Sequence, residues 1–66
     1  MQLTINGEAR TLDPVDTVDA MLRQLGLDPR GVVVELNRAI IRRADVTASR
    51  VHDGDTVEIV HFVGGG

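Results

Sequence analysis

The sequence predicts an α+β fold in which one main helix packs on one face of a mixed sheet of four to five strands. Three features predict this class: two pairs of strand-like segments, one amphipathic segment with helical spacing, and a strong strand-like segment near the last residue. A single helix can cover only one face of such a sheet, so we expect a two-layer roll. The first and last strands are expected to be parallel neighbours, joined through a crossover that contains the helix.

The chain is predicted to open with a β-hairpin. Apolar and polar residues alternate over residues 1–5, which is typical of a half-buried strand. Asn6-Gly7 follows, and this dipeptide strongly favours a two-residue type I′ turn. A returning strand over about residues 8–12 should end at Asp13-Pro14, because proline has no N–H to donate to a ladder.

A short helix is predicted after Thr17, whose hydroxyl suits the N-cap position. Gly26 suits the left-handed position that follows the last turn, and Leu27 can supply the apolar contact of a Schellman ending. The apolar residues between these two signals recur at helical spacing. They are Val18, Met21, Leu22 and Leu25.

Three more strands are predicted after the helix. Residues 32–36 and 39–41 are rich in β-branched residues, and Asn37-Arg38 can form the turn between them. Residues 42–52 are predicted to be a mostly polar connection with Val46 and Val51 as apolar anchors. After a turn at residues 53–55, the strongest strand runs over residues 56–63 and leads directly into three glycines.

Composition limits the classes of function. Sixty-six residues allow one domain, which we place at residues 1–63 with residues 64–66 as a flexible tail. The net charge of −3 and the absence of a broad basic face argue against nucleic acid as a partner. No apolar stretch approaches the length needed to cross a bilayer, and no signal peptide is recognisable. A cytoplasmic protein without contact to a membrane is therefore expected, and a monomer would suit a chain that inserts its end into other proteins.

Few side chains suggest catalysis or metal binding. His52 and His61, in a chain without cysteine, provide fewer ligands than a zinc site requires, so no metal is expected. His61 alternates onto the inward side of the last strand. A hydrolytic triad of Ser49, His52 and Asp53 is not expected, because one exposed loop offers neither an oriented base nor an oxyanion pocket. Glu35 and Asp45 are interpreted as ordinary solvated carboxylates.

Two surfaces are candidates for docking. Alternation along the last strand places Val57, Ile59 and Val63 inward, and Val60 and Phe62 on the opposite face. If this strand lies in the middle of the sheet, Val33 joins the outward pair. The candidate docking residues are Val33, Val60, Phe62 and, at the root of the tail, Val63. A bulge that turns Phe62 into the core is the alternative, and a basic surface of Arg38, Arg42 and Arg43 is a less favoured docking candidate.

The chain ends with Gly64-Gly65-Gly66, and glycine has no Cβ to collide with the walls of a narrow channel. Such a tail could present its α-carboxylate inside another protein, or it could be a spacer. Three segments bear on this choice: the helix exit at residues 25–31, the acidic turn and strand at residues 53–59, and the ending at residues 61–66. Together they resemble the ThiS-like sulfur carriers of bacterial thiamin biosynthesis, which have the ubiquitin-like β-grasp fold, and the resemblance spans essentially the whole chain.

The resemblance implies a carrier rather than an enzyme, with no cofactor bound to the chain itself. A ubiquitin-activating-enzyme-like adenylyltransferase, which uses ATP and Mg²⁺, would adenylate the carboxylate of Gly66. A persulfide sulfur donor would convert the adenylate into a thiocarboxylate, and a thiazole synthase would accept the sulfur. Gly64 and Gly65 would thread the tail into these partners. Two rival functions stay open: a sulfur carrier for molybdopterin or amino-acid synthesis, and a non-covalent interaction module whose glycines are a spacer.

Overall fold

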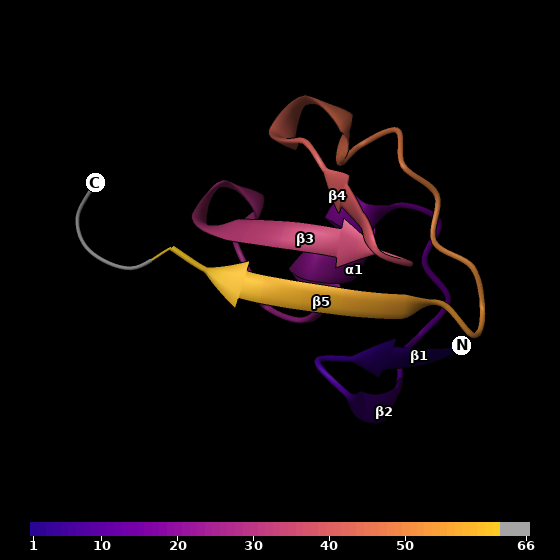
Figure 1. Cartoon of the computed structure of the whole chain (residues 1–66). Helices are drawn as coiled ribbons and strands as arrows, with labels where there is room; N and C mark the ends of the chain where they lie inside the picture. Colours follow the sequence, from indigo (N-terminus) through magenta and orange to yellow (C-terminus); the bar gives the residue numbers. More distant parts are fainter. Residues whose placement is uncertain (63–66) are drawn as a thin grey trace.

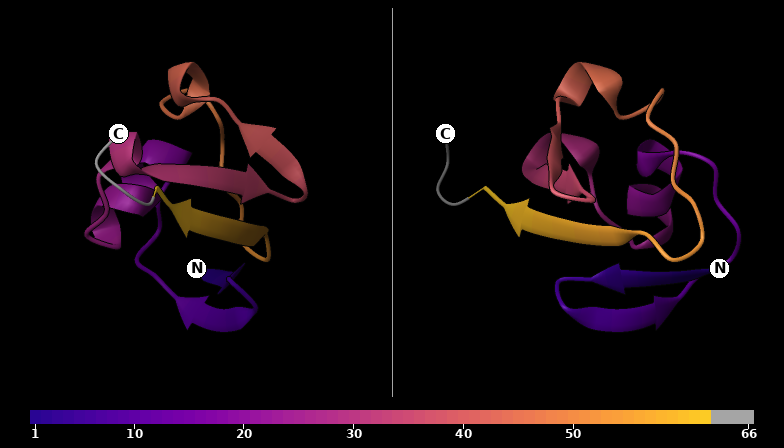
Figure 2. Two further views of the ribbon diagram at one scale, coloured as in Figure 1. Left: turned by 60° about the vertical axis from the view of Figure 1, so that its left-hand side comes forward. Right: turned by 45° about the vertical axis from the view of Figure 1, so that its right-hand side comes forward.

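The structure, a computed structural model, describes residues 1–62. Within this part of the chain, five strands form one mixed sheet in the order β2-β1-β5-β3-β4, and helix α1 covers one of its faces (Figures 1 and 2). The elements are β1 (Gln2–Ile5), β2 (Glu8–Thr11), α1 (Val18–Gln24), β3 (Val32–Leu36), β4 (Ala39–Ile41) and β5 (Thr56–His61), with short 3₁₀ helices η1 (Pro29–Gly31) and η2 (Arg43–Asp45).

The predicted fold class and strand arrangement are confirmed. β1 and β5 are parallel neighbours, with Thr4 opposite Thr56, whereas β1–β2, β3–β4 and β3–β5 are antiparallel pairs. β5 therefore lies at the centre of the sheet, which is the condition under which Val33 was expected to join Val60 and Phe62 on the outward face. It ends at His61, two residues before the predicted end, and Val63 and the three glycines lie outside the described residues.

Both hairpin turns use left-handed backbone conformations. Asn6 and Gly7 have φ values of 51° and 82°, the positive pair that a type I′ turn requires. Asn37 and Arg38 have φ values of 50° and 72°, so the second hairpin places an arginine where glycine is usually preferred. The first turn was predictable from its dipeptide, and the second carries some backbone strain.

Helix α1 begins and ends as predicted. The Thr17 hydroxyl oxygen accepts a hydrogen bond from the N–H of Ala20 (3.2 Å), which satisfies one of the free donors in the first turn. At the other end, Gly26 has a φ of +79°, and the N–H of Leu27 donates to the carbonyl of Leu22 (2.9 Å). This second bond defines the Schellman ending, so local signals in the sequence fix both ends of the helix.

The long connection between β4 and β5 packs against the start of α1. Val46 and Val51 are buried, which confirms their predicted role as apolar anchors. The carbonyls of Ser49 and Val46 accept hydrogen bonds from the N–H groups of Val18 and Asp19, each at 2.9 Å. The backbone carbonyls of this polar connection thus accept hydrogen bonds from N–H groups that have no partner within the helix, and these bonds hold the connection in place.

The core fills the space between α1 and the sheet. Twelve apolar residues are buried, and no polar or charged side chain is buried within residues 1–62. The buried residues are Leu3, Ile5, Leu12, Val18, Met21, Leu22, Val32, Val34, Val46, Val51, Val57 and Ile59. Burial of apolar surface is thus the main source of stability, as expected for a small domain without disulfides.

The side chain of Asn6 extends the parallel ladder between β1 and β5. Its Oδ1 accepts from the N–H of Ile59 (2.7 Å), and its Nδ2 donates to the carbonyl of the same residue (3.1 Å). Asn6→Gly keeps the left-handed turn but removes both bonds. We expect the free energy of unfolding to fall by about 1–2 kcal/mol, which thermal denaturation followed by circular dichroism would measure.

The control for this substitution is Arg38→Gly at the tip of the other hairpin. This position also has a left-handed backbone, and the Arg38 side chain makes no hydrogen bond within residues 1–62. Glycine should relieve strain there, so Arg38→Gly should be neutral or stabilising. Equal losses from the two glycine substitutions would contradict the role assigned to Asn6.

Candidate functional site

The face of the sheet opposite α1 is uncovered by any element of residues 1–62, and we call it the open face (Figure 1). Alternation along β5 sends Val57 and Ile59 into the core, where both are buried. Glu58 and Val60 therefore point to the open face, and both are exposed. This central strand thus contributes to the core and to a free surface at once.

The predicted apolar patch lies on the open face. Val33 of β3 is directly opposite Val60 of β5, and Val60 is 63% exposed while Val33 is half-buried. Phe62 is 57% exposed, so the alternative in which a bulge turns Phe62 into the core is wrong. Val63, the fourth candidate docking residue, lies outside the described residues.

One further apolar residue belongs to this face and was not predicted. Ile40, in the edge strand β4, is 67% exposed and lies directly opposite Glu35 of β3. Because Ala39 and Ile41 lie opposite the inward residues of β3, Ile40 faces outward. The alternation within residues 39–41 would have identified it if the pairing of β3 with β4 had been followed residue by residue.

Phe62, the last described residue, is held beside η1. The N–H of Phe62 donates to the carbonyl of Gly31 (3.0 Å), one residue beyond the end of β5. His61, predicted to lie on the inward side, is instead exposed, although it lies opposite the buried Val32. We attribute this exposure to its place at the very end of the strand, where the core ends. Gly64, Gly65 and Gly66 lie outside the described residues, and their roles stay predictions.

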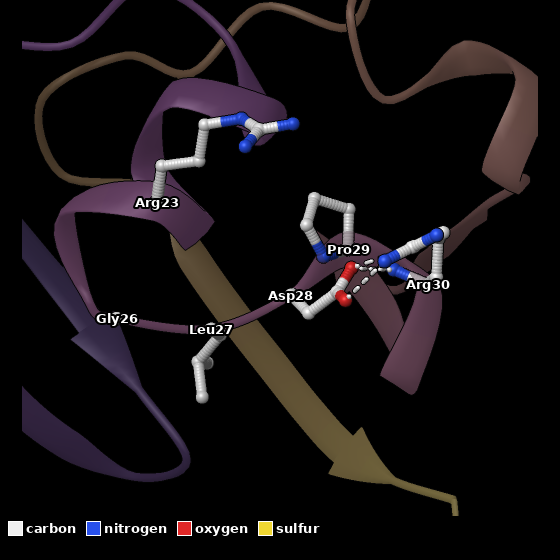
Figure 3. A pocket seen from close by; sticks show the side chains of 6 residues that line it. All are labelled: Arg23, Gly26, Leu27, Asp28, Pro29 and Arg30. Atoms are coloured by element: carbon white, nitrogen blue, oxygen red, sulfur yellow. Dashed lines mark hydrogen bonds and ion pairs between the residues drawn. The ribbon is translucent and has the colours of Figure 1, made fainter.

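A shallow pocket next to η1 contains charged groups that already have partners (Figure 3). The Arg30 guanidinium donates to the Asp28 carboxylate (3.0 and 3.2 Å), and the Arg30 backbone N–H also donates to it. These hydrogen bonds lower the pKa of Asp28 to about 2. The pocket is lined by Arg23, Gly26, Leu27, Asp28, Pro29 and Arg30. Because the charges of Asp28 and Arg30 are paired with each other, we assign this pocket a local structural role.

The other candidate groups of the sequence do not come together as a site. His52 contacts Asp55 at 4.0 Å, while the Asp53 carboxylate accepts from the backbone N–H of Gln2 (2.6 Å). Arg42 pairs with Asp45 at 3.2 Å. Residues 1–62 contain no cluster of three or more histidine, cysteine, aspartate or glutamate side chains able to hold a metal ion.

None of the helices in the described part of the chain has the length and apolar character needed to span a membrane.

Comparison with known proteins supports one family. The model of the ThiS family matches residues 3–66. A sulfur carrier protein ThiS from Thermus thermophilus is 36% identical over 62 residues, which are 94% of this chain and 95% of that protein. A thiazole synthase from Paramagnetospirillum magneticum is 47% identical over all 66 residues of this chain, and the chain spans only 20% of that protein's length.

A solved structure supports the same assignment. The crystal structure of a thiamine biosynthesis protein (ThiS) from Geobacter metallireducens has a TM-score of 0.83 to this chain, with 39% sequence identity and full coverage of both chains. The fold described above, one helix on a five-stranded mixed sheet with β1 and β5 parallel at its centre, is thus the ubiquitin-like β-grasp fold. The match of the family model, the relatives and the fold together show that this chain belongs to the ThiS family.

Proposed function

We propose that this chain is a sulfur carrier of thiamin thiazole biosynthesis, and that the α-carboxylate of Gly66 is the group that carries the sulfur. The observation that carries this proposal is the ThiS family match over residues 3–66, which includes the terminal glycines. The likeness to the Thermus thermophilus carrier, over nearly the full length of both chains, supports it. The open face offers an exposed apolar surface that extends to Phe62, and a carrier that binds several partners in turn needs such a surface.

The chemistry requires an activating partner, because a carboxylate is a poor acyl electrophile. In the proposed route, a carboxylate oxygen of Gly66 attacks the α-phosphorus of ATP, and pyrophosphate leaves. A sulfur nucleophile from a persulfide donor then attacks the acyl carbon, and AMP leaves, so that a thiocarboxylate results once the donor's sulfur–sulfur bond is reduced by a thiol. The chain has no lysine to hold phosphates and no glycine-rich loop before a helix. An adenylyltransferase related to ubiquitin-activating enzymes therefore supplies the ATP and Mg²⁺ site.

The remaining roles follow from this route. The chain is a co-substrate and not a catalyst, and a thiazole synthase is the acceptor of its sulfur. The matching stretch within a Paramagnetospirillum magneticum thiazole synthase supports this choice of acceptor. We propose a cytoplasmic monomer, because the end of the chain must enter each partner in turn.

Intact-mass spectrometry tests the proposal. The chain is incubated with the adenylyltransferase of the same genome, ATP, Mg²⁺ and a persulfide donor. The expected product has one oxygen replaced by sulfur, and fragmentation places the exchange at Gly66. A reaction without ATP is the control. Modification at any other residue would overturn the proposal. It would also be overturned if the adenylyltransferase loads a different sulfur carrier, which shows that the enzyme is active, but exchanges no oxygen for sulfur in this chain.

Phe62→Ser tests whether the exposed aromatic side chain is a docking residue. Because Phe62 is 57% exposed, we expect a melting temperature close to that of the unchanged chain. Loss of an aromatic anchor should raise the KM of the adenylyltransferase for the chain about fivefold to thirtyfold, with kcat little changed. Ile59→Ser serves as the comparison. Ile59 is buried and lies three residues before Phe62, so placing a serine there should unfold the domain. A loss of stability from Phe62→Ser as large as that from Ile59→Ser would contradict the docking role.

A further inference from the structure

Two glutamates occupy directly opposite positions in the middle of the open face. Glu35 of β3 and Glu58 of β5 are directly opposite each other in an antiparallel pair, so their side chains project to the same face. In such pairs the Cβ atoms are about 4.5–5.5 Å apart, and like charges placed directly opposite destabilise the sheet. The sequence gives no sign of this pair, because 22 residues separate the two glutamates along the chain.

Neither glutamate forms an ion pair within residues 1–62. The arginine–carboxylate ion pairs of the described residues join other side chains: Asp19 with Arg23, Asp28 with Arg30, and Asp45 with Arg42. On its other side, Glu35 lies opposite Ile40, which is apolar. The two glutamates thus form a small negative area with no cation of the described chain paired to it.

Apolar side chains flank the two glutamates along β3 and β5 and on the β4 side, whereas Thr4 and Thr56 lie toward β1. Ile40, Val60 and Phe62 are the exposed large apolar residues of the described chain, and all three belong to the open face or its end. Val33 is half-buried and lies two residues before Glu35 in β3, so it belongs to the same face. A partner that covers this face would exclude water from the glutamates, and burying two unpaired charges is costly. The partner must therefore supply positive charge at this point.

We infer that Glu35 and Glu58 together receive one arginine guanidinium of the thiazole synthase, while Ile40, Val60 and Phe62 make the apolar contacts around it. A guanidinium suits the pair because its planar group carries five donors and can serve two carboxylates at once. The inference rests on the proposed function, which makes a thiazole synthase the acceptor. The choice of this partner is supported by the thiazole synthase that contains a stretch matching this whole chain.

Isothermal titration calorimetry of the chain with the thiazole synthase of the same genome tests the inference without any sulfur chemistry. We expect the double variant Glu35→Gln/Glu58→Gln to raise Kd at least about tenfold at low ionic strength. Its affinity should also depend less on salt than that of the unchanged chain. The control Glu8→Gln/Asp13→Asn removes two negative charges at exposed positions away from the open face. Glu8 lies opposite the inward Ile5, and the backbone of Asp13 is hydrogen-bonded to Gln24 of α1. This control should leave Kd unchanged.

A second variant separates binding from folding. Glu35→Lys places opposite charges across the pair, so the melting temperature should rise by about 2–4 °C. The same change sets a lysine against the partner's arginine, so binding should weaken more than in the double glutamine variant. Equal Kd values for the unchanged chain and the double glutamine variant would overturn the inference, as would equal losses in the control. Self-association of the unchanged chain that these substitutions alter would overturn it too, because a second copy would then cover the face.

The outcomes also separate this inference from the proposed function. If sulfur is loaded at Gly66 but binding to the synthase ignores the two glutamates, the inference fails and the proposed function stands. If binding depends on the glutamates but no sulfur is loaded at Gly66, the proposed function fails and the docking inference stands. A synthase that does not bind the unchanged chain overturns the inference directly.

Discussion

A variant that lacks Gly65 and Gly66 is expected to take up no sulfur and to fold as well as the full chain. Under the proposed function, the reactive carboxylate must enter the adenylyltransferase on a segment without side chains. In the deletion variant the carboxylate is carried by Gly64 and lies two residues closer to the bulky Phe62 and Val63. Each extended residue spans roughly 3.3–3.6 Å, so the carboxylate would fall about 7 Å short of the ATP. Catalysis requires reacting atoms about 3–3.5 Å apart, so activity should be lost entirely.

Two measurements check this expectation. Intact-mass spectrometry should show no adenylate and no thiocarboxylate, and thermal denaturation should give the melting temperature of the full chain, since the buried residues run only from Leu3 to Ile59. A second variant, extended beyond Gly66 by a bulky and uncleavable tail, should be equally inert. Sulfur transfer by either variant would show that the end of the chain is not the carrier group. A pure interaction module would, by contrast, keep its partners after the deletion.

Leu22→Ala is expected to destabilise the fold strongly. Leu22 is fully buried on α1, and truncating such a leucine typically costs about 2–5 kcal/mol. A domain of this size has a total stability on the order of 3–10 kcal/mol. We therefore expect a variant that is largely unfolded or has a much lower denaturation midpoint in urea, measured by circular dichroism.

Leu25→Ala is the matched control for this prediction. Leu25 is the C-cap residue of the same helix and is only half-buried, so the identical chemical change should cost clearly less. Alanine is a good helix former at both positions, and a difference between the variants therefore reports packing against the sheet. Similar losses in both variants would show that the core is less well packed around Leu22 than the structure indicates.

Local signals in the sequence were sufficient for most of the fold. Asn6-Gly7 predicts its own turn because few other dipeptides tolerate two positive φ values, and Gly26 marks the end of α1 for the same reason. Apolar spacing distinguishes the helix from the strands. One helix and five strand-like segments then leave few arrangements in which the apolar side of every element is covered, which is why the parallel neighbours β1 and β5 could also be predicted.

Interactions between distant residues could not be predicted in this way. The bonds of Asn6 to Ile59 span 53 residues and depend on where the turn of the first hairpin meets β5. The segment between β4 and β5 is held in a defined conformation by hydrogen bonds to the free N–H groups at the start of α1. The polar sequence of this segment does not reveal those bonds. The pairing of Glu35 with Glu58 depends on the register between β3 and β5. Each of these features exists only once the strands have been aligned.

The bond between Phe62 and Gly31 sets a length scale for every partner of this protein. It is an anchored point on the rigid body, and four residues follow it to Gly66. Four residues can span at most roughly 13–14 Å. Under the proposed function, each enzyme that loads or empties the carrier must hold its reacting atoms within that radius of η1. The folded body therefore limits how deeply the terminal carboxylate can enter a partner, in addition to providing the surface that the partner binds.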